Sequence, residues 1–393
     1  MSCCITSTVS VSSDPLSPLA YDPATGRLAM MQIPSGQSNN PNNQTIQQFT
    51  WNYLAGSDLK SSLAYPNGLA ASWQYDANGQ LLQVKNAFPT NTISQYDYAY
   101  DAGGRRVQIT RSGSAMSETR TDVYGYNIRS ELISAAKLVG GDDPGAPQTA
   151  TTEYAYQYDD IGNRITSLDL GTNRTYTANN LNQYTQISNL CDSLPAVALA
   201  EAGAGEVFLP QFDDDGNQTL IQTATGVWQV QYNGENRPTL WSRVQLNNSN
   251  NTNNETIILM SYDRMGRRVK YLEACGSATN ENTVFTYDGY LQITNFNFAN
   301  KSAQHFIWDP TEPVATRPLV FYDSAAPPQF YTHDGNKNVS ELVSFFDGFI
   351  VMHYEYAPFG VVIVGGGGVN PLRFSSEFFD DSLALVCYIV SAH

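Results

Sequence analysis

The residues of this sequence that could do chemistry are its acidic residues and histidines, so metal binding is the first possibility to weigh. The run Asp213–Asn217 reads Asp-Asp-Asp-Gly-Asn and is similar to the start of a calcium-binding loop. It lacks the complete ligand series of such a loop, including the glutamate at the last position. No two histidines lie four residues apart, the spacing at which a helix would place both on one zinc ion. We therefore predict no metal site; the histidines are His305, His333, His353 and His393.

Catalysis by a nucleophile or by an acid–base pair is the second possibility. No Gly-x-Ser-x-Gly elbow is present, and we interpret the neighbours His333 and Asp334 as part of a turn. The pairs Asp142–Asp143 and Asp380–Asp381 are adjacent in sequence, and adjacent residues on a strand point to opposite faces, which does not suit a cooperating acid and base. Gly365–Gly368 lacks the Lys-Ser/Thr of a phosphate loop and is interpreted as a linker. The sequence predicts a protein that is not an enzyme and needs no cofactor.

The cysteines are odd in number and irregularly spaced, which supports neither a disulfide framework nor a zinc site. We interpret them as small hydrophobic residues; they are Cys3, Cys4, Cys191, Cys275 and Cys387.

Composition excludes further function classes. The formal net charge of −16 over 393 residues repels phosphate backbones, so we expect no nucleic-acid partner. The first residues lack the basic and apolar regions of a signal peptide, and no apolar stretch is long enough to span a bilayer. Hydrophobic residues make up 41% and aromatic residues 12%, which suffices for a folded core.

The elements that would position these residues are set by an internal repeat. A unit Tyr-Asp-x-x-Gly recurs along the chain, and Asp with Gly three residues later is typical of a tight turn between two strands. The clearest copies are Tyr75, Asp76 and Gly79; Tyr100, Asp101 and Gly104; Tyr158, Asp159 and Gly162; and Tyr262, Asp263 and Gly266. Variants begin at Tyr21 and Phe212, and degenerate copies at Tyr65, Tyr126, Tyr232 and Tyr287.

The segments between the turns alternate with a period of two, which predicts strands with one buried face. Tyr96, Tyr98 and Tyr100 share one face of a strand, and Trp228 and Val230 share one face of another; Tyr154, Tyr156 and Tyr158 follow the same pattern. Evidence for helix is limited to Ser193–Gly203, while Asp142–Pro147 and Asn247–Asn254 are predicted loops. We predict an all-β array of twisted antiparallel hairpins.

With these copies from about Tyr21 to Tyr290, the sequence resembles the YD-repeat family, which includes bacterial Rhs proteins, insecticidal toxin-complex shells and animal teneurins. The C-terminal quarter is similar to the Rhs repeat-associated core. The matching residues are Trp308, Asp309 and Pro310; His333 and Asp334; Tyr354, Tyr356, Pro358 and Gly360; and Asn370, Pro371, Arg373 and Phe374. We accordingly divide the chain into a repeat array, residues 1–303, and a core-like region, residues 304–393.

The resemblance implies a hollow β-shell that encloses a C-terminal toxin or passenger domain, with a core that plugs the shell and cleaves itself at an aspartyl motif. After Leu383–Val386, however, this sequence reads Cys387 to His393 and contains neither the cleavage motif nor a toxin domain. We hypothesise a broken reading frame, in which the passenger and further shell repeats are the missing partners. For an intact member the resemblance implies a secreted or cell-surface location.

The expected function is a structural shell segment of an Rhs-type polymorphic toxin or contact-competition protein. The alternative is a cell-surface adhesin that binds carbohydrate or protein through exposed tyrosines, whereas tyrosines buried in ladders favour the shell. Arg164, Arg268 and Arg373 are expected to pair with repeat aspartates, and Arg373 is expected to be the most buried of them.

Overall fold

The computed structural model describes residues 19–34, 46–139, 149–189, 207–244, 256–312, 317–324, 326–365 and 370–388. Over these ranges the chain is built from antiparallel β-strands, with a single 3-10 turn at Phe374–Ser376, and the prediction of an all-β fold is confirmed. The predicted helix Ser193–Gly203, the predicted loops Asp142–Pro147 and Asn247–Asn254, Cys3, Cys4, Cys191 and His393 lie outside the described residues.

Two large sheets carry most of the strands, and within each sheet every strand pairs with the next one in sequence. The first sheet has 15 strands. They are β1 (Leu19–Tyr21), β2 (Leu28–Pro34), β3 (Ile46–Tyr53), β4 (Lys60–Ala64), β5 (Ala70–Tyr75), β6 (Leu81–Phe88), β7 (Asn91–Tyr100), β8 (Arg106–Ser112), β9 (Arg120–Tyr126), β10 (Leu132–Val139), β11 (Thr149–Tyr158), β12 (Arg164–Asp169), β13 (Thr172–Ala178), β14 (Tyr184–Asn189) and β15 (Val207–Phe208).

The second sheet has 13 strands and continues across the predicted boundary between residues 303 and 304. They are β16 (Gln211–Phe212), β17 (Gln218–Thr223), β18 (Gly226–Tyr232), β19 (Pro238–Arg243), β20 (Thr256–Tyr262), β21 (Arg268–Cys275), β22 (Ala278–Asp288), β23 (Leu291–Asn297), β24 (Ser302–Trp308), β25 (Pro318–Asp323), β26 (Ala326–His333), β27 (Val339–Ser344) and β28 (Ile350–His353). Two short hairpins follow, β29 (Glu355–Tyr356) with β30 (Val362–Val364), and β31 (Phe378–Asp380) with β32 (Leu385–Cys387).

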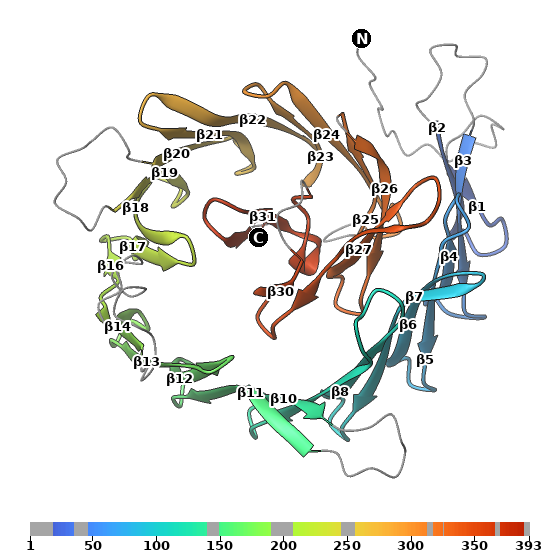
Figure 1. The fold of residues 1–393 in the computed structure, drawn as a ribbon, viewed down its shortest axis with the longest axis horizontal. Helices are drawn as coiled ribbons and strands as arrows, with labels where there is room; N and C mark the ends of the chain where they lie inside the picture. The colour runs from blue at the N-terminus through green and yellow to red at the C-terminus, as the bar shows by residue number, and fades with distance from the viewer. Residues whose placement is uncertain are drawn as a thin grey trace.

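The strands follow one another around a ring that turns inward at its end (Figure 1). The last strands of the second sheet, β25 to β27, lie on the inner side of the first strands, and the two short hairpins lie inside the ring (Figure 1). The two sheets are not paired to each other between β15 and β16. Pro210, which lies between these strands, has no backbone N–H to donate to a ladder.

The repeated aspartate shapes each turn. Asp101 Oδ1 accepts hydrogen bonds from the backbone N–H groups of Gly103 and Arg105, both at 2.9 Å, and Gly104 adopts a positive φ of 78°. The other clear copies do the same at Asp76, Asp159 and Asp263, with positive φ at Gly79, Gly162 and Gly266. Asn127, Asn179 and Asn233 replace the aspartate in further copies. An amide oxygen accepts these bonds as well as a carboxylate does, which explains why the sequence pattern is degenerate there.

The repeated tyrosine joins one repeat to the preceding one. Tyr100 Oη donates to the carbonyl oxygen of Leu81 at 2.7 Å, and Leu81 is the first strand residue after the preceding turn. The same bond runs from Tyr126 to Arg106, from Tyr158 to Leu132, from Tyr232 to Gln218, from Tyr262 to Pro238, from Tyr287 to Arg268 and from Tyr356 to Val339. These hydroxyls are therefore used within the fold, in agreement with tyrosines arranged in ladders.

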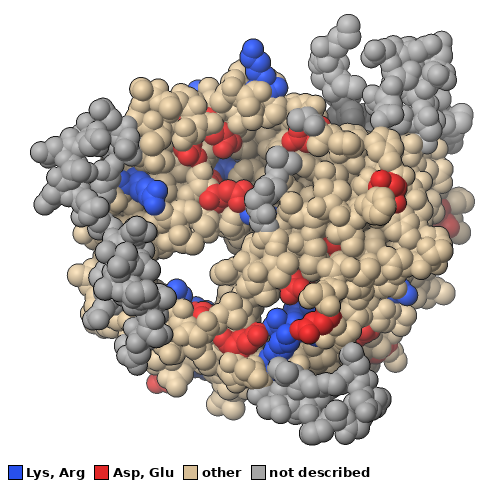
Figure 2. All heavy atoms as spheres, in the orientation of Figure 1, with Lys and Arg blue, Asp and Glu red and all other residues tan. Residues whose placement is uncertain are grey.

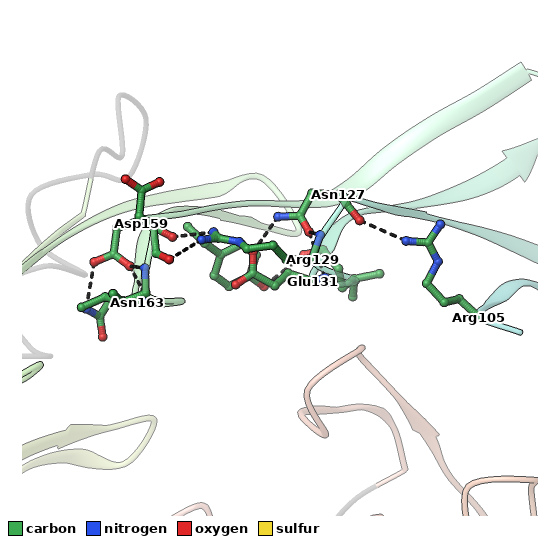
Figure 3. A network of polar contacts seen from close by, with 10 residues as sticks. Arg105, Asn127, Arg129, Glu131, Asp159 and Asn163 are labelled. Atoms are coloured by element: carbon green, nitrogen blue, oxygen red, sulfur yellow. Dashed lines mark hydrogen bonds and ion pairs between the residues drawn. The ribbon is translucent and has the colours of Figure 1, made fainter. Parts of the chain in front are cut away.

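A chain of polar contacts links neighbouring turns along one rim of the ring (Figure 3). Arg105 Nη1 donates to the carbonyl oxygen of Asn127 at 3.0 Å, and Asn127 Nδ2 donates to Glu131. Arg129 then pairs with Glu131 and also donates to the carbonyl oxygen of Asp159, as Figure 3 shows. Arg105 and Arg129 therefore each connect one turn with the next turn along the chain.

Candidate functional site: the ring closure and the enclosed C-terminal segment

The ring closes by side-chain packing between its first and last strands. Phe49 on β3, Tyr65 after β4 and Phe330 on β26 meet in one cluster, with ring centroids 5.3 to 5.7 Å apart. Phe49 and Phe330 are fully buried, and Val320 and Val343 from the last strands belong to the same core. Such aromatic pairs add about 0.5–1.5 kcal/mol beyond the apolar area that they bury.

Polar bonds cross the same closure. Tyr65 Oη donates to the carbonyl oxygen of Tyr331 at 2.8 Å, and Asn86 Nδ2 donates to the carbonyl oxygen of His333 at 3.1 Å. Asn86 is 1% exposed, so its side chain is held in place by these partners. The closure is therefore specified by buried hydrogen bonds as well as by apolar packing.

His333 and Asp334 form a turn of the repeat type, as the sequence predicts. Asp334 Oδ1 accepts from the N–H groups of Asn336 and Asn338, and Tyr98 Oη accepts from the N–H of Gly335 at 2.7 Å. Burial holds the pKa of His333 well below its usual range, so the imidazole is neutral. Burial also raises the pKa of Asp334, whereas the N–H and the side chain of Arg105 lower the pKa of the half-buried Asp101. This turn thus differs from the others because the ring wall covers it.

A buried carboxylate that sequence reasoning missed lies at the centre of the closure. Glu341 on β27 is fully buried and accepts hydrogen bonds from Ser94 on β7 at 2.8 Å and from Thr332 at 2.5 Å. Ser340 donates to the same oxygen, and His353 Nδ1 lies 3.0 Å from the other carboxylate oxygen. Burial alone would lower the pKa of His353, but its hydrogen bonds to Glu341 and Glu355 raise it to about 9.

The predicted residues Trp308, Asp309 and Pro310 lie at the end of β24 and just beyond it. Trp308 Nε1 donates to the carbonyl oxygen of Gln292 at 2.7 Å, which places an indole where other repeats have a tyrosine. Asp309 is 2% exposed and lies 2.6 Å from Lys60 Nζ on β4, on the opposite side of the closure.

The remaining predicted core residues surround one buried amide. Asn370 Oδ1 accepts from Tyr331 Oη at 2.7 Å, and its Nδ2 donates to the carbonyl oxygen of Leu372 at 2.7 Å. Tyr354 and Asn370 are both buried, and Pro371 accepts from the N–H of Phe379. A Cβ added at Gly360, which follows Pro358 and Phe359, would lie 2.6 Å from the Phe374 ring. The Phe374 ring in turn packs 5.6 Å from that of Tyr356. The residues of the core motif are therefore mostly packing and positioning residues.

The three arginines do not pair with repeat aspartates. Arg164 has no ion-pair partner among the described residues; its guanidinium lies over Tyr156 at 4.7 Å and Phe359 at 4.6 Å instead. Arg268 pairs with Asp380, and Arg373 pairs with Asp381 through two bonds of 2.8 and 2.9 Å.

The repeat aspartates are paired by the residue four positions later, as in Asp101 with Arg105 and Asp263 with Arg267. The geometry of the turn brings the residue four positions after the aspartate, such as Arg267, back onto that aspartate. The residue after it, such as Arg268, points into the ring instead. The expectation that Arg373 is the most buried of the three is confirmed, because its side chain is 2% exposed and that of Arg268 is 10% exposed.

The last hairpin connects the enclosed segment to the wall. Asp380 binds Arg268, Phe378 packs 5.7 Å from Phe285, and Ser382 donates to Glu273 on β21. Asp380, the last residue of β31, and Asp381, in the turn that follows, bind different arginines. Figure 2 shows an opening through the molecule between these central segments and the wall on the β11–β18 side.

Two cavities border the enclosed segment. One of about 300 Å³ is lined by Tyr271, Glu281, Asn295, Phe379 and Asp380, among others. Another of about 430 Å³ lies between the wall and the Asp334 turn and is lined by Tyr100, Tyr126, Tyr356 and Arg106, among others. The hydroxyls of these three tyrosines are already bonded to backbone carbonyls.

Within the described ranges, no group of three or more His, Cys, Asp or Glu residues is arranged to hold a metal ion. In the same part of the chain, no helix is long and apolar enough to cross a membrane. Cys275 and Cys387 are not joined in a disulfide.

Comparison with known proteins identifies the fold. No protein-family model matches the chain, and no curated protein matches it. Among solved structures, TcdB2-TccC3-TEV superposes with a TM-score of 0.65 at 17% identity, over 93% of this chain and 18% of that chain. TcdB2-TccC3 gives 0.60 at 15% identity over 94% and 19%, and TcdB2-TccC3 without its hypervariable C-terminal region gives 0.59 at 17% over 93% and 18%. The chain thus has the β-shell fold of these proteins and spans less than a fifth of their length.

Proposed function

We propose that this chain is a wall segment of a hollow Rhs-type β-shell, which encloses a passenger domain and turns over no substrate. The observation that carries the proposal is the inward path of the chain: β29 to β32 lie inside the ring (Figure 1). β32 ends at Cys387 and is followed by Tyr388, the last described residue, so a passenger joined after it would start inside the ring. The similarity to TcdB2-TccC3 supports a shell role for the fold.

The similarity to solved structures motivates the passenger part of the proposal. One of the similar structures is described as lacking a hypervariable C-terminal region. If the passenger varies while the shell stays constant, the wall must fold without help from the passenger. The hydrogen bonds of the repeated tyrosines and aspartates meet this requirement, because both partners of each bond belong to the wall. In the same proposal the intact protein is bacterial and acts at the cell surface or after secretion.

The experiment that tests the proposal has two steps. The DNA on both sides of this reading frame is sequenced, and we expect it to encode further repeats and a variable domain. Electron microscopy of the longer product, with and without that domain, should show a hollow particle with internal density only when the domain is present. A domain that lies outside the particle would overturn the proposal.

A second candidate function, carbohydrate binding at a cell surface, has one observation in its favour. The cavity of about 430 Å³ presents the rings of Tyr100, Tyr126 and Tyr356 beside Arg106. Titration calorimetry of the chain with oligosaccharides tests this candidate, because binding that is lost in Tyr126→Ala would support a free-standing binding module.

A further inference from the structure

A lysine and an aspartate meet in a buried position at the ring closure. Lys60 Nζ lies 2.6 Å from Asp309 Oδ2 and 3.0 Å from Glu312 Oε1. The side chains of these residues are 13%, 2% and 17% exposed, respectively. The Lys60 amine therefore contacts both carboxyl groups, and an amine with two carboxyl groups provides what is needed to condense a lysine with an aspartate.

The two oxygens of Asp309 have different surroundings. Oδ1 accepts from the N–H of Thr311 at 2.9 Å and from its hydroxyl at 2.6 Å, while Oδ2 faces the amine of Lys60. Donors that are fixed around Oδ1 stabilise the negative charge that develops there when a nucleophile adds to the carboxyl carbon. Oδ2 is then the oxygen that can leave.

Burial keeps the two reacting groups in contact. Little water can compete for the amine of Lys60 or for the carboxyl group of Asp309, whose side chains are 13% and 2% exposed. The apolar closure surrounds this site: burial and the charge of Asp309 both raise the pKa of the neighbouring Tyr65, which is 5% exposed.

Glu312 is placed to transfer protons. Burial alone would raise its pKa, but Arg317 and Lys60 bring it to about 2, so Glu312 is an ionised carboxylate in direct contact with the Lys60 ammonium. Arg317 and Lys337 also bind Glu312 and hold it in position. A base at 3.0 Å from the nitrogen is within the reach required for general base catalysis.

We propose that Lys60 and Asp309 form an intramolecular isopeptide bond that closes the ring covalently, with Glu312 as the catalytic proton carrier. Glu312 takes one proton from the Lys60 ammonium, and the free amine attacks the carboxyl carbon of Asp309. The C–Oδ2 bond then breaks, and Oδ2 leaves with the two protons lost by the nitrogen as one water molecule. An ammonium and a carboxylate become a neutral amide, Glu312 returns to its starting state, and nothing is oxidised or reduced.

The first test is the intact mass of the full chain under denaturing conditions. We expect a mass lower than that of the sequence by one water molecule. Trypsin should fail to cut after Lys60, and digestion should release one branched peptide that contains both Lys60 and Asp309. An unmodified mass and normal cleavage after Lys60, after prolonged incubation of the folded chain, would overturn the proposal.

The chain offers a matched internal control. Lys137 Nζ also lies 2.6 Å from a carboxylate, that of Glu118, but the Glu118 side chain is 63% exposed. Trypsin should cut after Lys137, because water stabilises both charged groups there. A branched peptide at Lys137 would show that proximity alone is sufficient and would remove the role given to burial and Glu312.

Three variants identify the atoms involved. Lys60→Arg keeps the positive charge and should restore the unmodified mass, and loss of water in this variant would contradict the assignment. Asp309→Asn should lose one ammonia molecule instead of water, since the leaving group is then the amide nitrogen. Glu312→Gln should fold with the bond unformed or formed many-fold more slowly; circular dichroism of each variant confirms the β-fold.

Discussion

Arg268 and Asp380 lie 112 residues apart in the sequence, and their side chains meet inside the ring at 3.2 Å, where they join the wall to the last hairpin. The side chain of Asp380 is 3% exposed, and the Arg268 guanidinium also lies 4.5 Å from the centre of the Phe378 ring. This pair is the main charged connection between β21 and β31.

Replacing Arg268 with methionine should destabilise the protein by about 3–5 kcal/mol, because a buried carboxylate loses its partner. Urea unfolding followed by circular dichroism measures this change. The control is Lys137→Met, which removes a cation from an exposed pair and should cost about 0–1 kcal/mol. Equal effects of the two variants would show that the wall and the hairpin are not coupled through Arg268.

Removing a tyrosine hydroxyl that joins two repeats should lower the free energy of unfolding by less than the replacement of Arg268 does. Tyr287 Oη donates to the carbonyl oxygen of Arg268 at 2.7 Å, so Tyr287→Phe should lower the free energy of unfolding by about 0.5–1.5 kcal/mol. Tyr290→Phe is the control, since Tyr290 is 36% exposed and lies beyond the same strand. A similar loss in both variants would contradict a specific role for the bond between repeats.

Replacing Gly335 with alanine should destabilise the protein, whereas the same replacement at a glycine with open space around it should not. A Cβ at Gly335 would lie 2.7 Å from Tyr98 Oη and 2.9 Å from Leu81 Cδ2, so Gly335→Ala should cost about 1–3 kcal/mol through overpacking at the closure. Gly234→Ala is the matched control, because nothing lies within 4 Å of a Cβ at that position. Thermal unfolding of the two variants provides the comparison.

Stability should fall at alkaline pH as His353 loses its proton. Its pKa is about 9 in the folded chain, above the usual 6.5, so folding favours the protonated form. The contribution is complete below pH 6.5 and is lost as the pH rises through about 9, with each pKa unit equal to about 1.4 kcal/mol. The free energy of unfolding measured from pH 6 to 10 checks this slope, which should be weaker in His353→Gln.

The turns and the buried faces could be predicted from the sequence because both are local. An aspartate caps N–H groups two and four residues away, so Asp76-x-x-Gly79 predicts its own turn without reference to the rest of the chain. The alternation in β7 also follows from the sequence. Tyr96 and Tyr98 are 4% and 6% exposed, whereas Ala99, which lies between Tyr98 and Tyr100, is exposed.

The ring closure could not be predicted in this way, because its partners are far apart. Nothing near Ser94 indicates that it binds Glu341, 247 residues later. In addition, β27 is buried on both faces, since the first strands cover one side and the enclosed segment covers the other. A strand of this kind does not alternate, so the periodicity that identifies inner residues elsewhere gives no indication for Glu341.

The arginines show a related limit of sequence reasoning. An acidic protein with few cations suggests ion pairs, but the aromatic residues inside the ring provide another partner for a guanidinium. Arg164 lies between Tyr156 and Phe359, which belong to the wall and to the enclosed segment respectively. Only the three-dimensional path of the chain brings these two rings together.

The break between β15 and β16 has a mechanical consequence. The first sheet ends at Phe208 and the second begins at Gln211, so hydrogen bonds do not carry strain from one arc of the wall to the other across Pro210. Strands β4 to β6 lie beside β25 to β27 on the other side of the ring (Figure 1), where Tyr65 and Asn86 donate hydrogen bonds to carbonyl groups of β26. Among the described residues the two sheets form two arcs that lack a shared strand pair at Leu209 and Pro210, and we expect any widening of the ring to be a rotation of the arcs about these residues.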